Sequence, residues 1–550
     1  MSEQHASEAT PDDHAPEGTP RSVSETERKY RVHGLYRLPD LVGAGAVAAV
    51  DDLGVASLDA TYFDTDDLRL AREGITLRRR VGGEDEGWHL KLPVSTSGEA
   101  RTREEIQLPL SAGDDEDVPT DLRDLVGVLV RADGLGPVAT LRTERHSFRL
   151  ATTIAGDGDD GADEPQPVAM LTDDVVSVLD NDGTMVARFR ELELEDLPEA
   201  TPDAAEQAAA AVSSTLATAG AVTGEFVSKA VRALGPFAAA PPEVPEPHDV
   251  SPDDAGREAV RAHIARHTGR LRAADIAIRR DIDDAVHQMR VAARRLRSGL
   301  RVFRPLLDQE WADALRDELA WVAGELGDYR DTEVLLARLE DHLDHIPDGV
   351  DPEPARQHVE QVLTARLTEA RERALAMLRS KRYYDLHVRL IVAADDPVTT
   401  AEADLPSSQV IPPLVAGAWK KLARESTRLL ADELAIPGGA PDQEWHASRI
   451  TAKKARYAAE AAAPVFGEDA AAFGKQLSLV TEVLGEHQDA AIAIERVKDL
   501  ANEPGISAPA AFGLGALLSV EHDSAADTRT VFSTLWPKVS KRRWRRWLES

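Results

Sequence analysis

The chain has 550 residues and a formal net charge of −33, from 64 basic and 97 acidic residues. This excess of negative charge excludes a protein that binds polyanions over its whole surface, so any polyanion site has to be local. The sequence contains no cysteine, which excludes disulfides, thiolate metal sites and cysteine nucleophiles.

The first residues of the chain are acidic, contain proline and lack hydrophobic periodicity. They predict a disordered tail over 1–21. No apolar leader segment and no run of about 18 apolar residues is present. We therefore expect a cytoplasmic protein without a membrane partner.

Residues 22–196 show short segments of alternating polar and apolar character, separated by clusters of Gly, Pro and Asp. The segments are TERKYRV, SLDATYFD, ITLRRRV, WHLKLPV, REEIQLPL, SFRLATTI, VVSVLD and ARFRELELE. Helices are predicted after them, at 203–219 and within GEFVSKAVRAL. Short strands without long intervening helices predict an antiparallel barrel or sandwich.

Charged side chains alternate along these strands. In SETERKYRV, Glu25, Glu27 and Lys29 share one face, because successive side chains of a strand point to opposite sides. Such faces either lie in water around an apolar interior or line a polar lumen. The opposite face carries Thr26 and Arg28, which fill an apolar core poorly. The lumen is therefore favoured, with cations for a polyanion and glutamates for divalent metal ions.

The segment ETERKY resembles the E-x-E-x-K signature of the CYTH family, the triphosphate tunnel metalloenzymes. TYFDT, TLRRR, WHLKLP, REE, FRELELE and VSK follow in the order of that family. The resemblance implies an eight-stranded antiparallel tunnel that binds Mg²⁺ or Mn²⁺ and hydrolyses inorganic triphosphate or a triphosphorylated organic compound. Because some members are adenylate cyclases, a nucleotide triphosphatase or cyclase is an alternative.

The same resemblance implies roles for individual residues. Metal binding and catalysis are expected of the acidic residues Glu25, Glu27, Glu105, Glu191, Glu193, Glu195 and Asp174. Triphosphate binding is expected of the basic residues Lys29, Arg78, Arg80, Lys91, Lys229 and either Arg142 or Arg145. The sequence leaves the choice between Arg142 and Arg145 open, and Asp174 is preferred to Asp173. No P-loop offers another phosphate site.

Residues 236–254, PFAAAPPEVPEPHDVSPDD, are rich in proline and predict a semi-rigid linker. A tunnel domain is expected over 22–235 and a helical domain over 255–550. HQMRVAARRLRSGLR and HASRITAKKARYAAE both read H-x-x-R-[VI]-x-x-[RK]-[RK] and lie 159 residues apart, and ELGDYRD and VLGEHQD repeat at nearly the same offset. The helical domain is thus predicted to be a duplication, with halves at about 255–400 and 408–550.

Each copy of the repeated helix carries a basic stripe, since residues three and four apart share a helix face. No acidic residue interrupts the first stripe between Arg290 and Arg304. A solvated helix face is the plain interpretation, but in so acidic a chain the pattern favours a site for regularly spaced phosphates. The residues predicted to bind such a polyanion are His287, Arg290, Arg294, Arg295, Arg297, Arg301, His446, Arg449, Lys453, Lys454 and Arg456.

The stripes resemble the CHAD family, the conserved histidine α-helical domains, which is associated with inorganic polyphosphate and often follows a CYTH domain. Phosphate hydrogen bonding is expected of His287 and His446, with helix packing as the alternative, because neither has a Cys or His partner at metal-ligand spacing. Asp331 and Asp489 are expected to pair with the stripes in a structural role.

Together these patterns predict an α+β multidomain protein: an eight-stranded antiparallel β tunnel with flanking helices, then an all-α bundle of two duplicated halves. The predicted function is metal-dependent hydrolysis of inorganic triphosphate, coupled to polyphosphate binding and association with polyphosphate granules. The alternative is a non-catalytic polyphosphate-binding or granule-associated protein. A nucleic-acid partner is not expected, because the stripes lack a recognisable reading motif.

Overall fold

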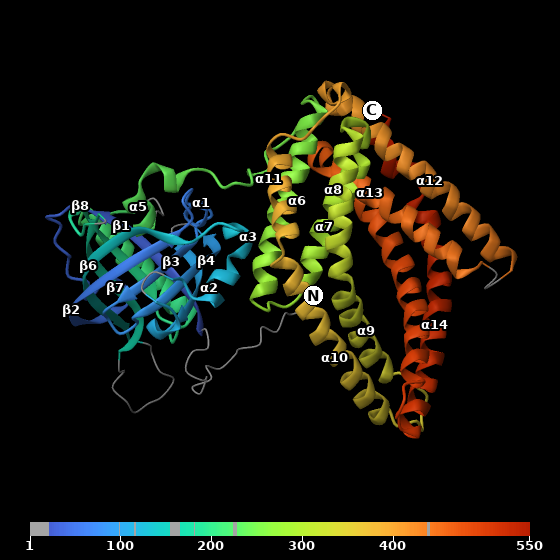
Figure 1. Cartoon of the computed structure of the whole chain (residues 1–550), viewed down its shortest axis with the longest axis horizontal. Helices are drawn as coiled ribbons and strands as arrows, with labels where there is room; N and C mark the ends of the chain where they lie inside the picture. Colours follow the sequence, from blue (N-terminus) through green and yellow to red (C-terminus); the bar gives the residue numbers. More distant parts are fainter. Residues whose placement is uncertain are drawn as a thin grey trace. The chain divides into compact units, whose positions relative to one another are not determined.

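The computed structural model describes residues 21–97, 100–114, 117–153, 165–180, 182–223, 228–436 and 440–549. All but the last residue of the predicted disordered tail therefore lies outside the described residues. The chain divides into two compact units between Glu243 and Val244, within the segment predicted as a linker. The first unit is rich in β-strands and the second is helical (Figure 1).

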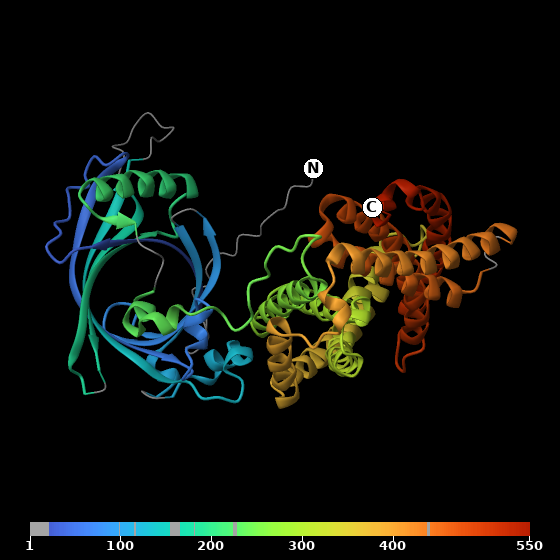
Figure 2. The same ribbon diagram turned by 90° about the horizontal axis from the view of Figure 1, so that it is seen from above.

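Eight strands of the first unit form an antiparallel sheet that closes on itself, which confirms the predicted fold class (Figure 2). They are β1 (Arg21–Val32), β2 (Val47–Asp64), β3 (Thr76–Val81), β4 (Gly87–Ser97), β5 (Ala100–Leu108), β6 (Gly136–Thr152), β7 (Gln166–Leu179) and β8 (Met185–Asp196). Their order is β5-β4-β3-β2-β6-β7-β8-β1, and pairing of β1 with β5 closes the barrel. The short strand β9 (Val222–Thr223) pairs with the end of β1.

The apolar faces of the strands point outward and are covered by helices. Helix α4 (Pro202–Thr218) packs over β7 and β8, and its Val212 and Leu216 are buried in one cluster with Tyr30 of β1. Arg28, beside Tyr30 on β1, is also buried, and its guanidinium pairs with Asp196 at 2.8 Å. Ion pairing therefore explains how a residue that fills an apolar core poorly is accommodated on the outer face.

One end of the barrel interior is apolar. Leu141 and Val176, which point inward from β6 and β7, form a buried cluster with Ala230 of helix α5 (Lys229–Leu234). Lys229 is the first residue of α5. The packing of α5 therefore holds the Lys229 side chain in the charged part of the barrel interior. The remaining short helices of this unit are α1 (Arg69–Arg72), η1 (Leu110–Ala112), α2 (Thr120–Leu125) and α3 (Gly127–Val130).

The first part of the predicted linker is attached to the barrel unit. It forms the short helix η2 (Pro236–Ala239). Farther along, the Glu243 carboxylate lies 2.6 Å from the guanidinium of Arg131 and 3.5 Å from that of Arg69. The segment up to Glu243 is therefore part of the first compact unit.

The second unit consists of helices. They are α6 (Gly256–Arg279), α7 (Ala285–Val302), η3 (Arg304–Leu306), α8 (Gln309–Glu325), α9 (Gly327–Leu343), α10 (Glu353–Leu378), α11 (Lys381–Asp395), η4 (Ala401–Asp404), α12 (Ser407–Ala435), α13 (Asp442–Ala501), α14 (Ala508–Val539) and η5 (Arg542–Leu548). Gly467 interrupts α13 with a φ of 65°, so α13 consists of two helices joined at a kink. None of the helices in the described ranges combines the length and apolar character that crossing a membrane requires.

The repeat offset of 159 residues relates the helices of this unit to one another. It relates α6 to α12, α7 to the first part of α13, α8 and α9 to the second part of α13, and α10 to α14. Helix α11 packs on α6, whereas the second half ends in the short η5, which packs on α12 and α13. The structure therefore has the internal repeat that the two basic stripes indicate.

Candidate functional site

Charged side chains of both signs line a cavity of about 60 Å³ inside the barrel. They come from strands that are distant in sequence. Side chains alternate between the two faces of each strand, and the charged face of each strand points into the barrel. Most residues predicted for the tunnel are in this lining: Glu25, Glu27, Lys29, Arg78, Arg80, Lys91, Glu105, Arg145, Glu193, Glu195 and Lys229.

The strand register places opposite charges directly across from one another. Lys29 on β1 is the partner of Glu193 on β8, and its ammonium pairs with that carboxylate. In the same way Lys91 on β4 is the partner of Glu105 on β5, with 3.4 Å between the charged atoms. Buried charges are tolerated when they are paired in this way.

Glu27 and Glu195 depart from this pattern of opposite charges across neighbouring strands, although Glu27 also lies 3.2 Å from Lys29. They are direct partners on β1 and β8 and carry the same charge. Burial raises the pKa of Glu195, and the neighbouring carboxylates Glu193 and Glu27 raise it further. Burial likewise raises the pKa of Glu25 to about 8, with a contribution from its hydrogen bond with Glu105. Carboxylates crowded in this way favour either a proton or a cation between them.

This part of the barrel offers the hard oxygen donors that Mg²⁺ and Mn²⁺ bind. Glu27 Oε1 is buried and accepts no hydrogen bond within the described part of the chain. Among the described residues, however, no three carboxylates or histidines converge as a preformed metal site. Lys29 and Lys91 bond to the carboxylates instead. The donor set therefore fits a divalent ion, provided that the two lysines take other partners.

A second region of the lining is predominantly basic. Arg78 lies 3.6 Å from the Glu105 carboxylate, which also accepts a 2.8 Å hydrogen bond from His89. Burial lowers the pKa of Arg80 to about 9, and the positive charges of Arg78 and Arg145 contribute. Burial also lowers the pKa of His89 to about 4, so this imidazole is neutral at pH 7. The excess of cations here suits an anion with several charged oxygens.

Asp174 and Glu191 lie behind the cavity rather than in its lining. Asp174 accepts hydrogen bonds of 2.9 and 2.7 Å from Arg145 and lies 2.9 Å from Lys229 Nζ. Glu191 lies 3.2 Å from Lys229 and 2.8 Å from Arg232. Both carboxylates therefore pair with basic residues beside the cavity, and neither is among the residues that line it.

Arg142 and Arg145 lie in different places on the barrel. Arg145 points into the barrel, whereas Arg142 is exposed and pairs with Asp59 at 2.8 Å on the outer surface. The two residues are three positions apart, so their side chains leave opposite faces of β6. Of the two arginines that the sequence leaves open, Arg145 therefore lies in the cavity lining and Arg142 lies outside it.

Five further residues line the cavity that were not among the predicted site residues: Tyr62, Thr76, Asp85, Arg103 and Ser228. Arg103 has the same strand parity as Glu105, which was a usable signal, and its Nε lies 3.7 Å from Glu27. Ser228 caps α5 through a 3.2 Å hydrogen bond from Val231 N to its hydroxyl and so helps to orient Lys229. Asp85 lies in the loop between β3 and β4, where strand parity gives no signal.

The two basic stripes of the helical unit lie on α7 and on the first part of α13, and these helices contact each other. Arg290 Nη1 lies 3.1 Å from Asp331 and donates to the Gly327 carbonyl at 2.7 Å. The equivalent pair in the second half, Arg449 and Asp489, is 3.8 Å apart. The predicted pairing of both aspartates with the stripes is therefore present.

Several basic groups of the stripes lack such partners. No side-chain hydrogen bond or ion pair within the described residues is made by His287, Arg294, Arg297, Arg301, Lys453 or Lys454. Burial lowers the pKa of Lys453 to about 8, with further lowering from Arg449 and Arg294. The cations of the two stripes therefore repel one another and would gain from a shared anion. His446 differs from His287, since its Nδ1 lies 2.6 Å from Gln488 Oε1.

Comparisons with known proteins agree with this arrangement. A CYTH domain is matched over residues 24–221 and a CHAD domain over 262–498. An uncharacterized protein of Mycobacterium tuberculosis strain H37Rv is 32% identical over 533 residues, which cover 94% of this chain and 96% of that protein.

Two solved structures resemble parts of the chain. PptA from Streptomyces chartreusis is 25% identical, with a TM-score of 0.43, and covers 52% of this chain and 99% of its own. The CHAD domain from the plant Ricinus communis is 25% identical, with a TM-score of 0.42, and covers 53% of this chain and 95% of its own. On the family matches and the full-length relative, the chain belongs to the CYTH and CHAD families and carries a CYTH domain followed by a CHAD domain.

Proposed function

We propose that the barrel hydrolyses inorganic triphosphate with the help of Mg²⁺ or Mn²⁺. The observation that carries this proposal is the division of charge in one interior, with a carboxylate pair at Glu27 and Glu195 and a basic region around Arg78 and Arg80. A triphosphate bound to a divalent ion has the complementary division of charge. The carboxylate pair alone would favour any divalent cation, and the basic region alone would favour any anion. Only the two together favour a triphosphate with its metal ion.

The roles of the residues follow from their present partners. The phosphate-binding residues are Lys29, Arg78, Arg80, Lys91, Arg145 and Lys229. The residues that would hold the metal ion are Glu25, Glu27, Glu193 and Glu195. Glu105, Asp174 and Glu191 are positioning residues, because each bonds to basic residues of the barrel.

Binding of the substrate would exchange ion pairs within the barrel. Lys29 and Lys91 now bond to Glu27, Glu193 and Glu25, and phosphate oxygens offer these lysines alternative partners. The released carboxylates would then be available as oxygen donors. When bound, the divalent ion would neutralise phosphate charge and lower the pKa of a water molecule. The fixed cations would stabilise the charge on the transferred phosphoryl group.

We further propose that the helical unit binds inorganic polyphosphate along α7 and α13 and brings the protein to polyphosphate granules. Support comes from the basic side chains of the two stripes that lack acidic partners, and from the lowered pKa of Lys453. Binding should weaken steeply with salt, since each neutralised phosphate releases a counterion.

The test measures phosphate release by the purified full chain from inorganic triphosphate, ATP and long-chain polyphosphate, with Mg²⁺ or Mn²⁺. The control is a Glu25→Ala/Glu27→Ala variant whose folding is checked by its melting temperature. Metal-dependent release from triphosphate that this variant loses would support the proposal. Release from ATP in preference to triphosphate would favour a nucleotide triphosphatase, and polyphosphate binding without any release would favour the non-catalytic alternative.

A further inference from the structure

The internal repeat of the helical unit is broken at one pair of charges. Arg295 on α7 reaches Glu460 on α13, and their charged atoms lie 2.7 Å apart. The repeat offset takes Arg295 to Lys454 and Glu460 to Arg301. The symmetry equivalent of a salt bridge is therefore a pair of like charges, Lys454 and Arg301.

The two ends of the paired helices consequently differ in charge. Glu460 also pairs with Arg456 at 2.8 Å and so neutralises cations of both helices. At the other end, burial lowers the pKa of Lys454, and the positive charges of Arg301 and Lys421 lower it further, against a raising contribution from Glu425. Within the described residues neither Arg301 nor Lys454 has an ion-pair partner. This end lacks the carboxylate that the repeat supplies at the other end.

A pocket of about 490 Å³ opens at the uncompensated end. Its basic residues are Arg301, Arg304, Lys421 and Lys454, and no acidic residue is among the described residues that line it. Arg304 pairs with Asp313 at 2.9 Å and Lys421 with Glu425 at 4.0 Å, so Arg301 and Lys454 are the two cations of this lining without an ion pair in the described part of the chain. The rest of its wall is largely apolar and includes Val302, Pro305, Leu414, Ala418 and Ala458. This volume lies within the range of small-molecule sites, and a bare phosphate would leave the apolar wall in contact with water.

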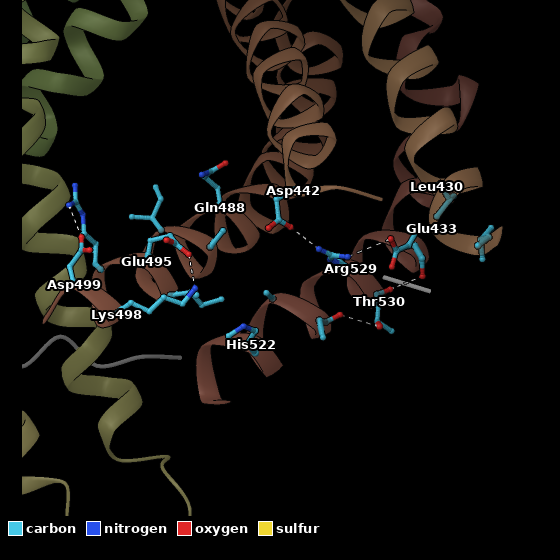
Figure 3. A pocket seen from close by; sticks show the side chains of 18 residues that line it. Leu430, Glu433, Asp442, Gln488, Glu495, Lys498, Asp499, His522, Arg529 and Thr530 are labelled. Atoms are coloured by element: carbon cyan, nitrogen blue, oxygen red, sulfur yellow. Dashed lines mark hydrogen bonds and ion pairs between the residues drawn. The ribbon is translucent and has the colours of Figure 1, made fainter. Parts of the chain in front are cut away.

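A larger cavity of the same unit serves as a comparison. It has a volume of about 1020 Å³ and lies among α12, α13 and α14 (Figure 3). Its charges are paired with one another, as Arg529 lies 2.8 Å from Asp442 and Lys498 lies 2.8 Å from Glu495. The pocket at Arg301 and Lys454 differs in that these two cations have no such partner within the described residues, although its other two cations, Arg304 and Lys421, are paired.

We propose that the pocket at Arg301 and Lys454 binds phosphate or diphosphate esters that carry an apolar hydrocarbon group. The phosphate would take the place that a carboxylate occupies in the Arg295–Glu460 pair, and the apolar group would cover Leu414 and Ala418. Part of this inference rests on the proposed polyphosphate surface, because Arg301 and Lys454 belong to both. Its specificity for an ester is separate, since it depends on the apolar wall.

The experiment measures binding to the full chain by calorimetry. The ligands are geranyl diphosphate, inorganic diphosphate, geraniol and long-chain polyphosphate. We expect geranyl diphosphate to bind at least about tenfold more tightly than inorganic diphosphate, and geraniol not to bind measurably. The Arg301→Glu substitution introduces the carboxylate that the repeat has at Glu460. It should weaken geranyl diphosphate binding at least about tenfold and raise the melting temperature, because a like-charge pair becomes an ion pair.

A raised melting temperature shows that loss of binding does not come from misfolding. Lys420→Glu is the matched control, because Lys420 is exposed on α12 beside Lys421 but does not line the pocket. This variant should bind geranyl diphosphate as the unchanged protein does. Equal affinity for geranyl and inorganic diphosphate, or binding that Arg301→Glu leaves intact, would overturn the inference.

Further arms separate this inference from the proposed function and identify the source of the ester. Polyphosphate binding without geranyl diphosphate binding overturns only the inference about the pocket. Geranyl diphosphate binding without polyphosphate binding supports the pocket and overturns the polyphosphate proposal. Vesicles containing phosphatidic acid test a membrane source, and binding to them without binding of geranyl diphosphate contradicts a pocket for soluble esters.

Discussion

Glu27 on β1 and Glu195 on β8 are direct cross-strand partners, and both side chains line the barrel cavity. Like charges in this position destabilise a sheet, whereas neighbouring partners such as Lys29 and Glu193 carry opposite charges. The exception makes this point of the barrel the best candidate for a divalent cation. The same pair should lower the stability of the barrel without a metal ion and favour binding when the ion is present.

Replacing Glu195 by Gln should therefore have two opposite effects. Without divalent ions at pH 8, we expect the free energy of unfolding to rise by about 0.5–1 kcal/mol, because carboxylate repulsion is removed. The additional stabilisation by Mg²⁺ or Mn²⁺ should shrink, since one oxygen donor of the ion is lost. Thermal denaturation with EDTA and with added metal measures both effects.

Glu144→Gln is the matched control, because Glu144 on β6 is exposed and lies 3.7 Å from Arg188 outside the cavity. It should change neither the stability without metal nor the effect of the metal. If the Glu195→Gln variant keeps the full stabilisation by metal, Glu195 is not a metal ligand and the proposed position of the metal site is wrong.

Arg142 and Arg145 offer a paired test on one strand. Arg145→Ala should reduce triphosphate hydrolysis by about 10²–10³-fold, the usual effect of losing a group that stabilises transition-state charge. It should also lower the free energy of unfolding by about 1–3 kcal/mol, because Asp174 loses two charge-assisted hydrogen bonds. Arg142→Ala should change stability by less than about 0.5 kcal/mol and leave turnover unchanged. Steady-state kinetics and urea denaturation of both variants decide the matter, and equal losses of turnover would contradict the assignment.

Strand parity is the reason why much of the candidate site was predictable. Glu25, Glu27 and Lys29 are separated by two positions each, and such residues share a face whatever the curvature of the sheet. The same argument fails where the sequence does not show which of two basic residues points into the barrel. The motif LRTERHSF permits Arg142 or Arg145, and only the register with β7, which places Asp174 opposite Arg145, separates them.

Other features depend on three-dimensional packing and had no sequence signal. The positions of Asp174 and Glu191 behind the cavity follow from the way α5 brings Lys229 to them.

The fold of the helical unit, in contrast, was predictable, because a repeated sequence pattern indicates a repeated structure. The like-charge pair of Arg301 and Lys454 could not be predicted from the repeat alone. It becomes evident only from the contact between Arg295 and Glu460, which lie on different helices.

Lys229 should control the pH dependence of stability. Burial raises the pKa values of Asp174 and Glu193, but Lys229 and other cations bring them below their ordinary values. The stabilisation by these carboxylates is therefore present above the pKa of the unfolded chain and is lost as the pH falls through the folded pKa. Lys229→Met should lower the free energy of unfolding by about 3–5 kcal/mol at pH 7.5, because buried carboxylates lose a partner. The difference from the unchanged protein should shrink below about pH 4, as the pH falls from the unfolded-chain pKa values towards the lowered folded ones.

Urea denaturation at pH 7.5 and at about pH 3.5, below the unfolded-chain pKa values of Asp and Glu, tests this dependence. Lys498→Met is the control, since Lys498 pairs with Glu495 on the surface of α13 and should change stability by no more than about 1 kcal/mol. A loss from Lys229→Met that is the same at both pH values would show that Lys229 acts through packing rather than charge.

Lys453 should take up a proton when the helical unit binds polyphosphate. Burial and the charges of Arg449 and Arg294 lower its pKa to about 8, so about half of these side chains are neutral at pH 8. A bound polyanion favours the charged form and raises the pKa. Affinity should therefore fall as the pH rises above 8, because the proton needed for binding becomes scarcer. Calorimetry at pH 8 in two buffers with different ionisation enthalpies measures the proton uptake, and Lys453→Arg should abolish it without losing binding, since a guanidinium stays protonated. Equal uptake by Lys453→Arg and the unchanged protein would assign the proton to another group of the stripes.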